Sequence, residues 1–182
     1  MPDVVVVRPD RAVASFAARP LTERSKPQRG DRIVLIDNGK PNAAALLRAF
    51  ADRVAALLDL DPSDIEIERK ASAGVPIAAD RAQALAERAS FAITGLGDCG
   101  GCSACSVHDA IIFEGLGVPA IPIITEPFQG LCGMVADRLG LPSIAPMVVP
   151  HPVSTKDQAW LEHLAELNAE PMANRLADRS AV

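Results

Sequence analysis

The chain has 182 residues, of which 49% are hydrophobic and 23% are charged, and its formal net charge is −5. This length and this composition indicate one folded domain with an ordinary core and exclude a disordered chain. The negative charge, together with an aromatic content of only 3% and no Tyr, argues against nucleic acid or an anionic membrane surface as a partner.

No targeting or membrane-spanning segment is expected from the sequence. The apolar run Val4–Val7 is too short for a secretory signal and ends at Arg8. No stretch approaches the roughly 18 apolar residues that a membrane span needs. We therefore expect a cytoplasmic protein whose thiols stay reduced. Three of the four cysteines fall within seven residues, which indicates redox, metal or nucleophile chemistry rather than a disulfide framework.

Residues 1–30 differ in character from the rest of the chain. They contain four prolines and five arginines, which predict an extended arm, or an edge strand at Val4–Val7. Residues 31–182 are predicted to form the α/β domain.

From Asp31 onward, short apolar runs alternate with segments of helical periodicity. The predicted strands are Arg32–Asp37, Asp64–Arg69, Ser90–Leu96, Val118–Thr125 and Ile144–Val149. The predicted helices are 43–58, Ala79–Ala89, 100–116, Leu131–Leu139 and Thr155–Asn168. Alternation with short connections predicts a single doubly wound, mostly parallel sheet of about four or five strands with helices on both faces. Asp64–Arg69 alternates and is expected near an edge, and Pro171 is expected to interrupt the last helix.

Polar side chains follow four of the five predicted strands. Carboxyl ends of parallel strands meet at one edge of the sheet, where α/β proteins bind ligands. We therefore expect a site for a small-molecule substrate at this edge. The expected substrate-binding residues are Asp37, Asn38, Lys40, Asn42, Thr125 and Glu126.

Cys99 and Cys102 follow the third strand through a glycine-rich turn that leads into a helix. Free N–H groups and the positive end of the helix dipole stabilise a thiolate at such a position. The C-x-x-C spacing allows one thiolate to attack an adduct or disulfide at the other cysteine. Asp98, His108 and His151 are the candidates for proton transfer beside the two cysteines.

A metal or Fe–S cluster is the alternative for the same segment. Cys105 and His108 continue the three-residue spacing, so Cys99, Cys102 and Cys105 form a possible ligand set. On one continuous helix, however, successive ligands rise by about 4.5 Å, and the segment would have to unwind to surround one ion. Cys105 is therefore predicted to be a packing residue, and Cys132 to lie in the core.

Several stretches together resemble the UGSC family of proteins and selenoproteins, named for a Sec/Cys-Gly-Ser-Cys turn. These stretches are Leu35–Asn42, Gly97–Cys102, Ser106–Asp109, Thr125–Phe128 and Val149–Pro152. The chain departs from the family pattern in having Gly101 in place of the serine, and Cys105 at a position that is often aromatic. The layout is also similar, more weakly, to aspartate/glutamate racemase-like domains and to the selenocysteine subunit of glycine reductase.

The resemblance implies that Cys99, which occupies the position of selenocysteine, is a nucleophile and that Cys102 is its resolving thiol. We expect a thiol-dependent enzyme with redox or reductive-cleavage activity, no obligatory cofactor and an external thiol reductant. A racemase- or lyase-like cysteine enzyme without net redox change is one alternative, and a metal- or Fe–S-binding subunit is another. We also expect a homo- or hetero-oligomer.

Overall fold

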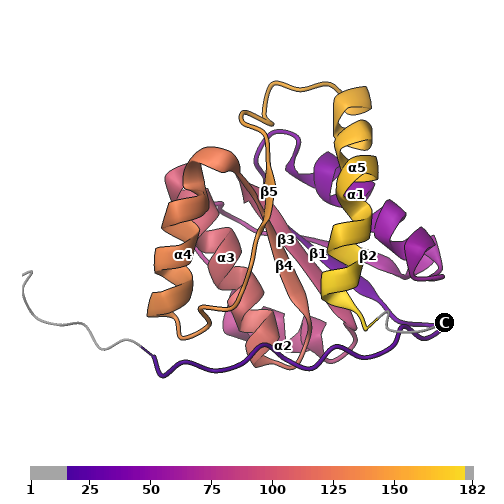
Figure 1. Ribbon diagram of the computed structural model, residues 1–182, viewed down its shortest axis with the longest axis horizontal. Coiled ribbons are helices and arrows are strands. Elements are labelled where there is room, and N and C mark those ends of the chain that lie inside the picture. Colours follow the sequence, from indigo (N-terminus) through magenta and orange to yellow (C-terminus); the bar gives the residue numbers. More distant parts are fainter. Residues whose placement is uncertain (1–15, 179–182) are drawn as a thin grey trace, which may run out of the picture.

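The computed structural model describes residues 16–178, which fold around one parallel five-stranded sheet (Figure 1). The strands are β1 (Ile33–Asp37), β2 (Ile65–Arg69), β3 (Phe91–Gly97), β4 (Ala120–Thr125) and β5 (Met147–Val149). The helices are α1 (Ala43–Leu57), α2 (Ala79–Ala86), α3 (Gly100–Gly115), α4 (Gln129–Arg138) and α5 (Gln158–Leu176), with short 3-10 turns at Pro62–Asp64 and Glu126–Phe128. The strand order is β2-β1-β3-β4-β5, so the predicted doubly wound α/β fold is confirmed.

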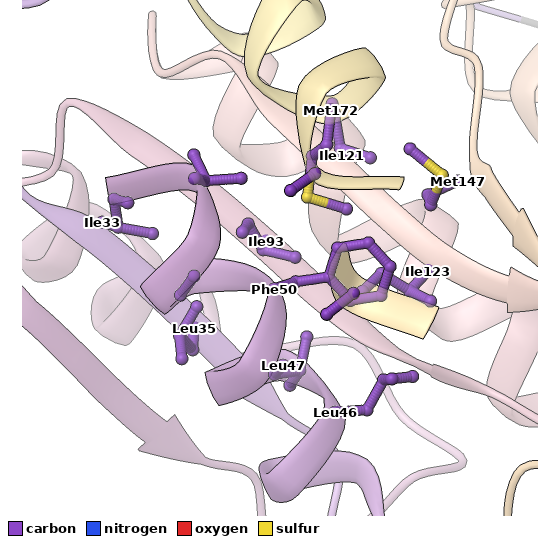
Figure 2. Packing of buried hydrophobic residues seen from close by; sticks show 14 of the residues in the cluster. Ile33, Leu35, Leu46, Leu47, Phe50, Ile93, Ile121, Ile123, Met147 and Met172 are labelled. Carbon is purple, nitrogen blue, oxygen red and sulfur yellow. The ribbon is translucent and has the colours of Figure 1, made fainter. Parts of the chain in front are cut away.

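Helices cover both faces of the sheet, and each face has its own core. Successive strand residues point to opposite faces, so Ile33 and Leu35 of β1 join one core and Val34 and Ile36 join the other. The first core packs beneath α1 and α5, where Phe50 lies close to Ile123 and Met172 (Figure 2). The second core lies beneath α2, α3 and α4.

Strand β2 is an edge strand, as its alternating pattern predicts, and none of its residues is buried. Exposed Ile67 is flanked by two ion pairs, Arg88–Glu66 and Arg81–Glu68. Charged side chains on an edge strand oppose its pairing with another chain. This edge is therefore protected against pairing with another chain.

The expected break of the last helix at Pro171 is wrong, because α5 continues through it to Leu176. Proline in a helix interior costs about 3 kcal/mol. Pro171 is exposed, so water can reach the carbonyl that it leaves without a partner. Met172, Ala173 and Leu176 beyond it are fully buried, and burial of large apolar side chains at about 1.5–3 kcal/mol each outweighs the loss.

Residues 16–30 form an extended strap with no strand, which runs along the amino ends of the strands (Figure 1). Arg24 pairs with the buried carboxylate of Glu114 at 2.7 Å, and the backbone N–H of Thr22 donates to the same carboxylate at 2.8 Å. Arg19 N–H donates to the carbonyl of Gly140. The arm is therefore held on the domain. The edge strand predicted at Val4–Val7 lies outside the described residues.

Candidate active site

Strands β1 and β3 are neighbours whose following helices lie on opposite faces of the sheet. β1 leads to α1, and β3 leads to α3. The two loops diverge at this switch point, and ligand sites of doubly wound sheets form in the crevice between such loops. Three of the expected site residues, Asp98, Cys99 and Cys102, lie directly after β3.

Cys99 is the N-cap residue of α3, and its sulfur accepts a hydrogen bond from the backbone N–H of Cys102 at 3.3 Å. The two residues form a disulfide, with their Cα atoms 5.4 Å apart. Cys99 is half-buried, whereas Cys102 is 1% exposed. After reduction, Cys99 is therefore the more accessible of the two cysteines, and the helix N-terminus favours its thiolate.

Gly97 permits the close approach of α3 to the sheet. A Cβ atom at this position would lie 2.7 Å from Ile124 Cγ2 and 2.8 Å from Ser103 Oγ. Any side chain there would displace the first turn of α3, which carries both sulfurs. The glycine thus positions Cys99 through packing.

Asp98 connects the cysteine turn to the loop after β5. Its Oδ1 lies 2.9 Å from His151 Nδ1, and its two carboxylate oxygens accept the backbone N–H groups of Val153 (3.3 Å) and Ser154 (3.1 Å). The Asp98 side chain is 6% exposed and that of His151 is 37% exposed. A buried carboxylate therefore holds an accessible imidazole, and this carboxylate belongs to the residue next to Cys99.

Thr125, at the end of β4, fixes the tautomer of His151. Its hydroxyl donates to the carbonyl of Gly97 at 3.1 Å, and the same oxygen lies 3.1 Å from His151 Nδ1. A hydroxyl has one hydrogen, so here its oxygen accepts from the ring N–H. Nδ1 therefore carries the proton, and in the neutral ring Nε2 keeps the lone pair of a base. The ring also meets Phe128 edge-on, with centroids 5.9 Å apart.

The loop after β1 supplies mainly structural hydrogen bonds. Asn38 is buried and its amide donates to the carbonyl of Leu96 at 2.8 Å. The amide of Asn42 donates to the carbonyls of Val153 and Lys156, and Asp37 accepts the N–H of Gly39. Asn38 and Asn42 thus join the loop of β1 to β3 and to the loop after β5, and Asp37 orders its own loop. Sequence reasoning assigned all three side chains to substrate binding.

Lys40 and Glu126 differ from the other polar residues at this edge of the sheet, because their charged groups have no partner among residues 16–178. Lys40 is half-buried and Glu126 is exposed. Neither charged group makes a hydrogen bond or an ion pair with residues 16–178. Of the residues predicted to bind substrate, these two keep their charged groups available for a ligand.

His108 lies away from this site. It is nine residues beyond Cys99, about 13.5 Å along the axis of α3 at 1.5 Å per residue, and it lines a different pocket with Phe16 and Arg19 of the strap. Burial lowers the pKa of His108. The structure therefore brings Asp98, Cys99, Cys102 and His151 together, and separates His108 from them.

A buried ion pair next to Cys105 was missed by sequence reasoning. Lys70 Nζ lies 2.5 Å from Asp109 Oδ2, and Oδ1 of Asp109 accepts the N–H of Ile77 at 2.7 Å. A lysine that directly follows a half-exposed edge strand is normally solvated, so the sequence carried no signal for this ion pair. Burial raises the pKa of the Asp109 carboxyl against the opposing effect of Lys70.

The other two cysteines lie in surroundings that disfavour a thiolate. Burial raises the pKa of Cys105, and raises that of Cys132 to about 11. Within residues 16–178, no three His, Cys, Asp or Glu side chains are grouped so that they could hold a metal ion. Over the same residues, no helix is long and apolar enough to cross a membrane.

A comparison with family models decides the affiliation of the chain: the model of the UGSC family matches residues 5–178. The chain belongs to the UGSC family. The matched range of this UGSC protein includes the strap and the whole site described above. No curated protein matches it in sequence. Among solved structures, it is similar to a diflavin flavoprotein A3 from Nostoc sp., at 14% identity and a TM-score of 0.42, over 81% of this chain and 96% of that one.

Proposed function

We propose that this UGSC protein is a thiol–disulfide oxidoreductase that reduces a small disulfide or a comparable two-electron acceptor. The observation that carries the proposal is the Cys99–Cys102 disulfide at the N-terminus of α3, beside the Asp98–His151 pair. Of the four cysteines, these two are close enough to bond to each other, and Cys99 is the more accessible.

The first step is attack by the Cys99 thiolate on one sulfur of the substrate disulfide. A bond forms between Cys99 Sγ and that sulfur, the substrate S–S bond breaks, and the other half leaves as a thiolate. The N–H groups of the first turn of α3 stabilise the attacking anion before the reaction. Lys40, whose ammonium is available, is our candidate for binding an anionic group of the substrate.

In the second step, the Cys102 thiolate attacks Cys99 Sγ of the mixed disulfide. The Cys99–Cys102 bond forms and the second half of the substrate leaves as a thiolate, so the substrate gains two electrons that the protein dithiol loses. An external dithiol then reduces Cys99–Cys102 and is itself oxidised. The burial of Cys102 protects it from direct attack and reserves it for this step.

His151 accepts and returns the proton in these steps. Its Nδ1–H is held by Asp98 and Thr125, so Nε2 is the atom that takes a proton from a thiol and gives it to the departing thiolate. Asp98 stabilises the imidazolium that forms. This arrangement gives Asp98 a positioning role, and it leaves the proton transfer itself to the ring.

Mass spectrometry after a single turnover tests the proposal. Reduced protein is mixed with bis(2-hydroxyethyl) disulfide, quenched with acid and mapped by peptide. Wild type is expected to end with Cys99 and Cys102 bonded to each other and two molecules of mercaptoethanol released. Cys102→Ser is expected to stop at a mercaptoethanol adduct on Cys99, and Cys99→Ser to react only at the rate of a free thiol.

Cys105→Ser is the matched control, since it removes one thiol from the same helix. It should still yield the Cys99–Cys102 disulfide and two molecules of mercaptoethanol. An adduct that accumulates on Cys105 or Cys132 in wild type would contradict the proposal. Two further results together would also contradict it: wild type turns over a substrate without any reductant, and Cys102→Ser is fully active. A racemase- or lyase-like enzyme would give both results.

A further inference from the structure

A cavity lies at the amino end of the sheet, opposite the disulfide. Its volume is about 740 Å³. Four segments line it: Leu21 and Arg24 of the strap, the start of β4, the loop before β5, and the end of α5. Figure 1 shows the strap passing beneath the end of α5. Two hydrogen bonds join them: Arg24 Nε donates to the carbonyl of Arg175, and the backbone N–H of Asp178 donates to the carbonyl of Ser25. Pockets for small molecules have volumes in this range.

Arg175 is the unusual residue in this cavity. A guanidinium has five N–H donors. One of them, on Nη1, donates to the carbonyl of Pro146 at 3.3 Å, and the other four have no acceptor among residues 16–178. Burial lowers the pKa of Arg175, and the nearby positive charge of Arg24 lowers it further. A partly buried guanidinium with four open donors has the geometry to bind an oxyanion.

The other charges around the cavity are already paired. Arg24 uses its guanidinium on both oxygens of Glu114 and on the carbonyl of Thr22. Asn174 and Asp178, which also line the cavity, have interactions of their own. The remaining lining is mostly apolar, including Ile121 and Ile144. Among these charged side chains, Arg175 is thus the one with open donors, and apolar side chains form part of the wall that it faces. This combination suits a ligand with an apolar body and one anionic group.

We propose that this cavity is a second ligand site, in which the Arg175 guanidinium binds the carboxylate or phosphate of a small molecule with an apolar body. Two parallel N–H···O bonds to one oxyanion would use the planar fork of Arg175. The bound anion would also offset the repulsion between Arg175 and Arg24. This site is independent of the disulfide, so its test does not depend on the proposed oxidoreductase activity.

Calorimetric titration with defined probes tests this site in the full chain. Hexanoate, inorganic phosphate and neutral hexanol are titrated separately at one salt concentration. If the ligand carries a carboxylate on an apolar body, hexanoate is expected to bind saturably and hexanol is expected not to bind. If phosphate binds saturably instead, the site is assigned to a phosphate group. Arg175→Gln is expected to weaken binding of the active probe at least about tenfold, since it removes a charge-assisted bidentate contact.

Arg138→Gln is the matched control, because it removes an exposed positive charge outside the cavity and should leave binding unchanged. Ser143→Trp places a large side chain at the exposed rim of the cavity and should abolish binding without changing the charge, which provides a test even if Arg175→Gln does not fold. The proposal is overturned if no anionic probe binds saturably, if Arg138→Gln weakens binding as much as Arg175→Gln, or if Ser143→Trp binds as wild type does.

Discussion

Helix α3 joins two groups that contain the same residue types, a Cys, an Asp and a His, in contrasting surroundings. At its N-terminus, Asp98 binds the His151 ring and Cys99 caps the helix. In its middle, Asp109 binds Lys70, and Cys105 and His108 lie beside that ion pair. The residue types alone do not separate the two groups, whereas their hydrogen bonds and burial do.

The difference lies in the charge that each environment favours. The N-terminus of α3 offers free N–H groups to a thiolate, and a carboxylate to an imidazolium. In the middle of the helix, burial raises the pKa of Cys105 and lowers that of His108, so both are held in their neutral forms. The proposed catalysis by thiolate and imidazole therefore requires the first group, and we expect the second group to contribute to stability.

The sharpest test of this contrast compares two Cys→Ser variants on the same helix. Cys99→Ser is expected to slow reduction of bis(2-hydroxyethyl) disulfide by at least about 10³-fold, as expected when a nucleophile is lost. Cys105→Ser is expected to change the rate less than about threefold, because a partly buried thiol with a raised pKa contributes little thiolate. The rates are measured by stopped-flow detection of released thiol. Equal losses in the two variants would show that the division of α3 is wrong.

The buried ion pair predicts a large effect on stability. Lys70→Met leaves the Asp109 carboxylate buried without its cation, and the free energy of unfolding is expected to fall by about 3 kcal/mol or more. Urea denaturation measures it. Lys70→Met/Asp109→Leu should recover much of the loss, because no unpaired charge remains.

The control for Lys70→Met is Arg88→Met, which breaks the partly exposed pair with Glu66 and should cost less than about 1 kcal/mol. If Lys70→Met costs no more than Arg88→Met, the Lys70–Asp109 pair does not hold the middle of α3. The rate of disulfide exchange should remain near the wild-type value in every folded variant of this pair.

Removal of the proposed base predicts a smaller loss of rate. His151→Gln is expected to lower the exchange rate by about 10²-fold, at the lower end of the range for general acid–base groups. The rate should then rise with pH until the thiol itself ionises, since no ring accepts its proton. His163→Gln, at an exposed position of α5, is the control. A wild-type rate and pH profile in His151→Gln would remove the ring from the mechanism.

The sheet could be predicted because its local signals agree. Runs such as Ile33–Asp37 are buried on both faces and read as parallel strands, and polar residues at their ends mark the carboxyl edge. Predicted bounds were least accurate where packing decides, as at β5, which keeps only Met147–Val149 of the expected run, and at Pro171. The position of Cys99 and Cys102 at a helix N-terminus followed from the strand–turn–helix order.

The roles of individual polar residues could not be read in the same way. Asn38 and Asn42 follow β1 as ligand-binding residues do, yet their amides bind backbone carbonyls of other loops. Spacing along the helix placed His108 in line with Cys99, but a helix rises steadily and carries it away from the edge. Lys70 meets Asp109 through tertiary packing across 39 positions of sequence, and no local pattern encodes that contact.

The smallest predicted effect concerns pH and the half-buried ring of His108. Burial lowers its pKa in the folded state, with Asp109 opposing and Lys70 adding to that effect, so below about pH 6.5 the unfolded chain binds a proton that the folded chain does not. Stability is therefore lost as the pH falls through that value, until the lower pKa of the folded state is passed. Comparison of urea unfolding at about pH 7.5 and pH 5.5 should show a smaller loss in His108→Gln than in wild type, by less than about 1 kcal/mol because the ring is partly solvated. A loss that is equal in both proteins would mean that the middle of α3 does not hold His108 neutral, and the contrast between the two groups would then rest on Cys105 and Asp109 alone.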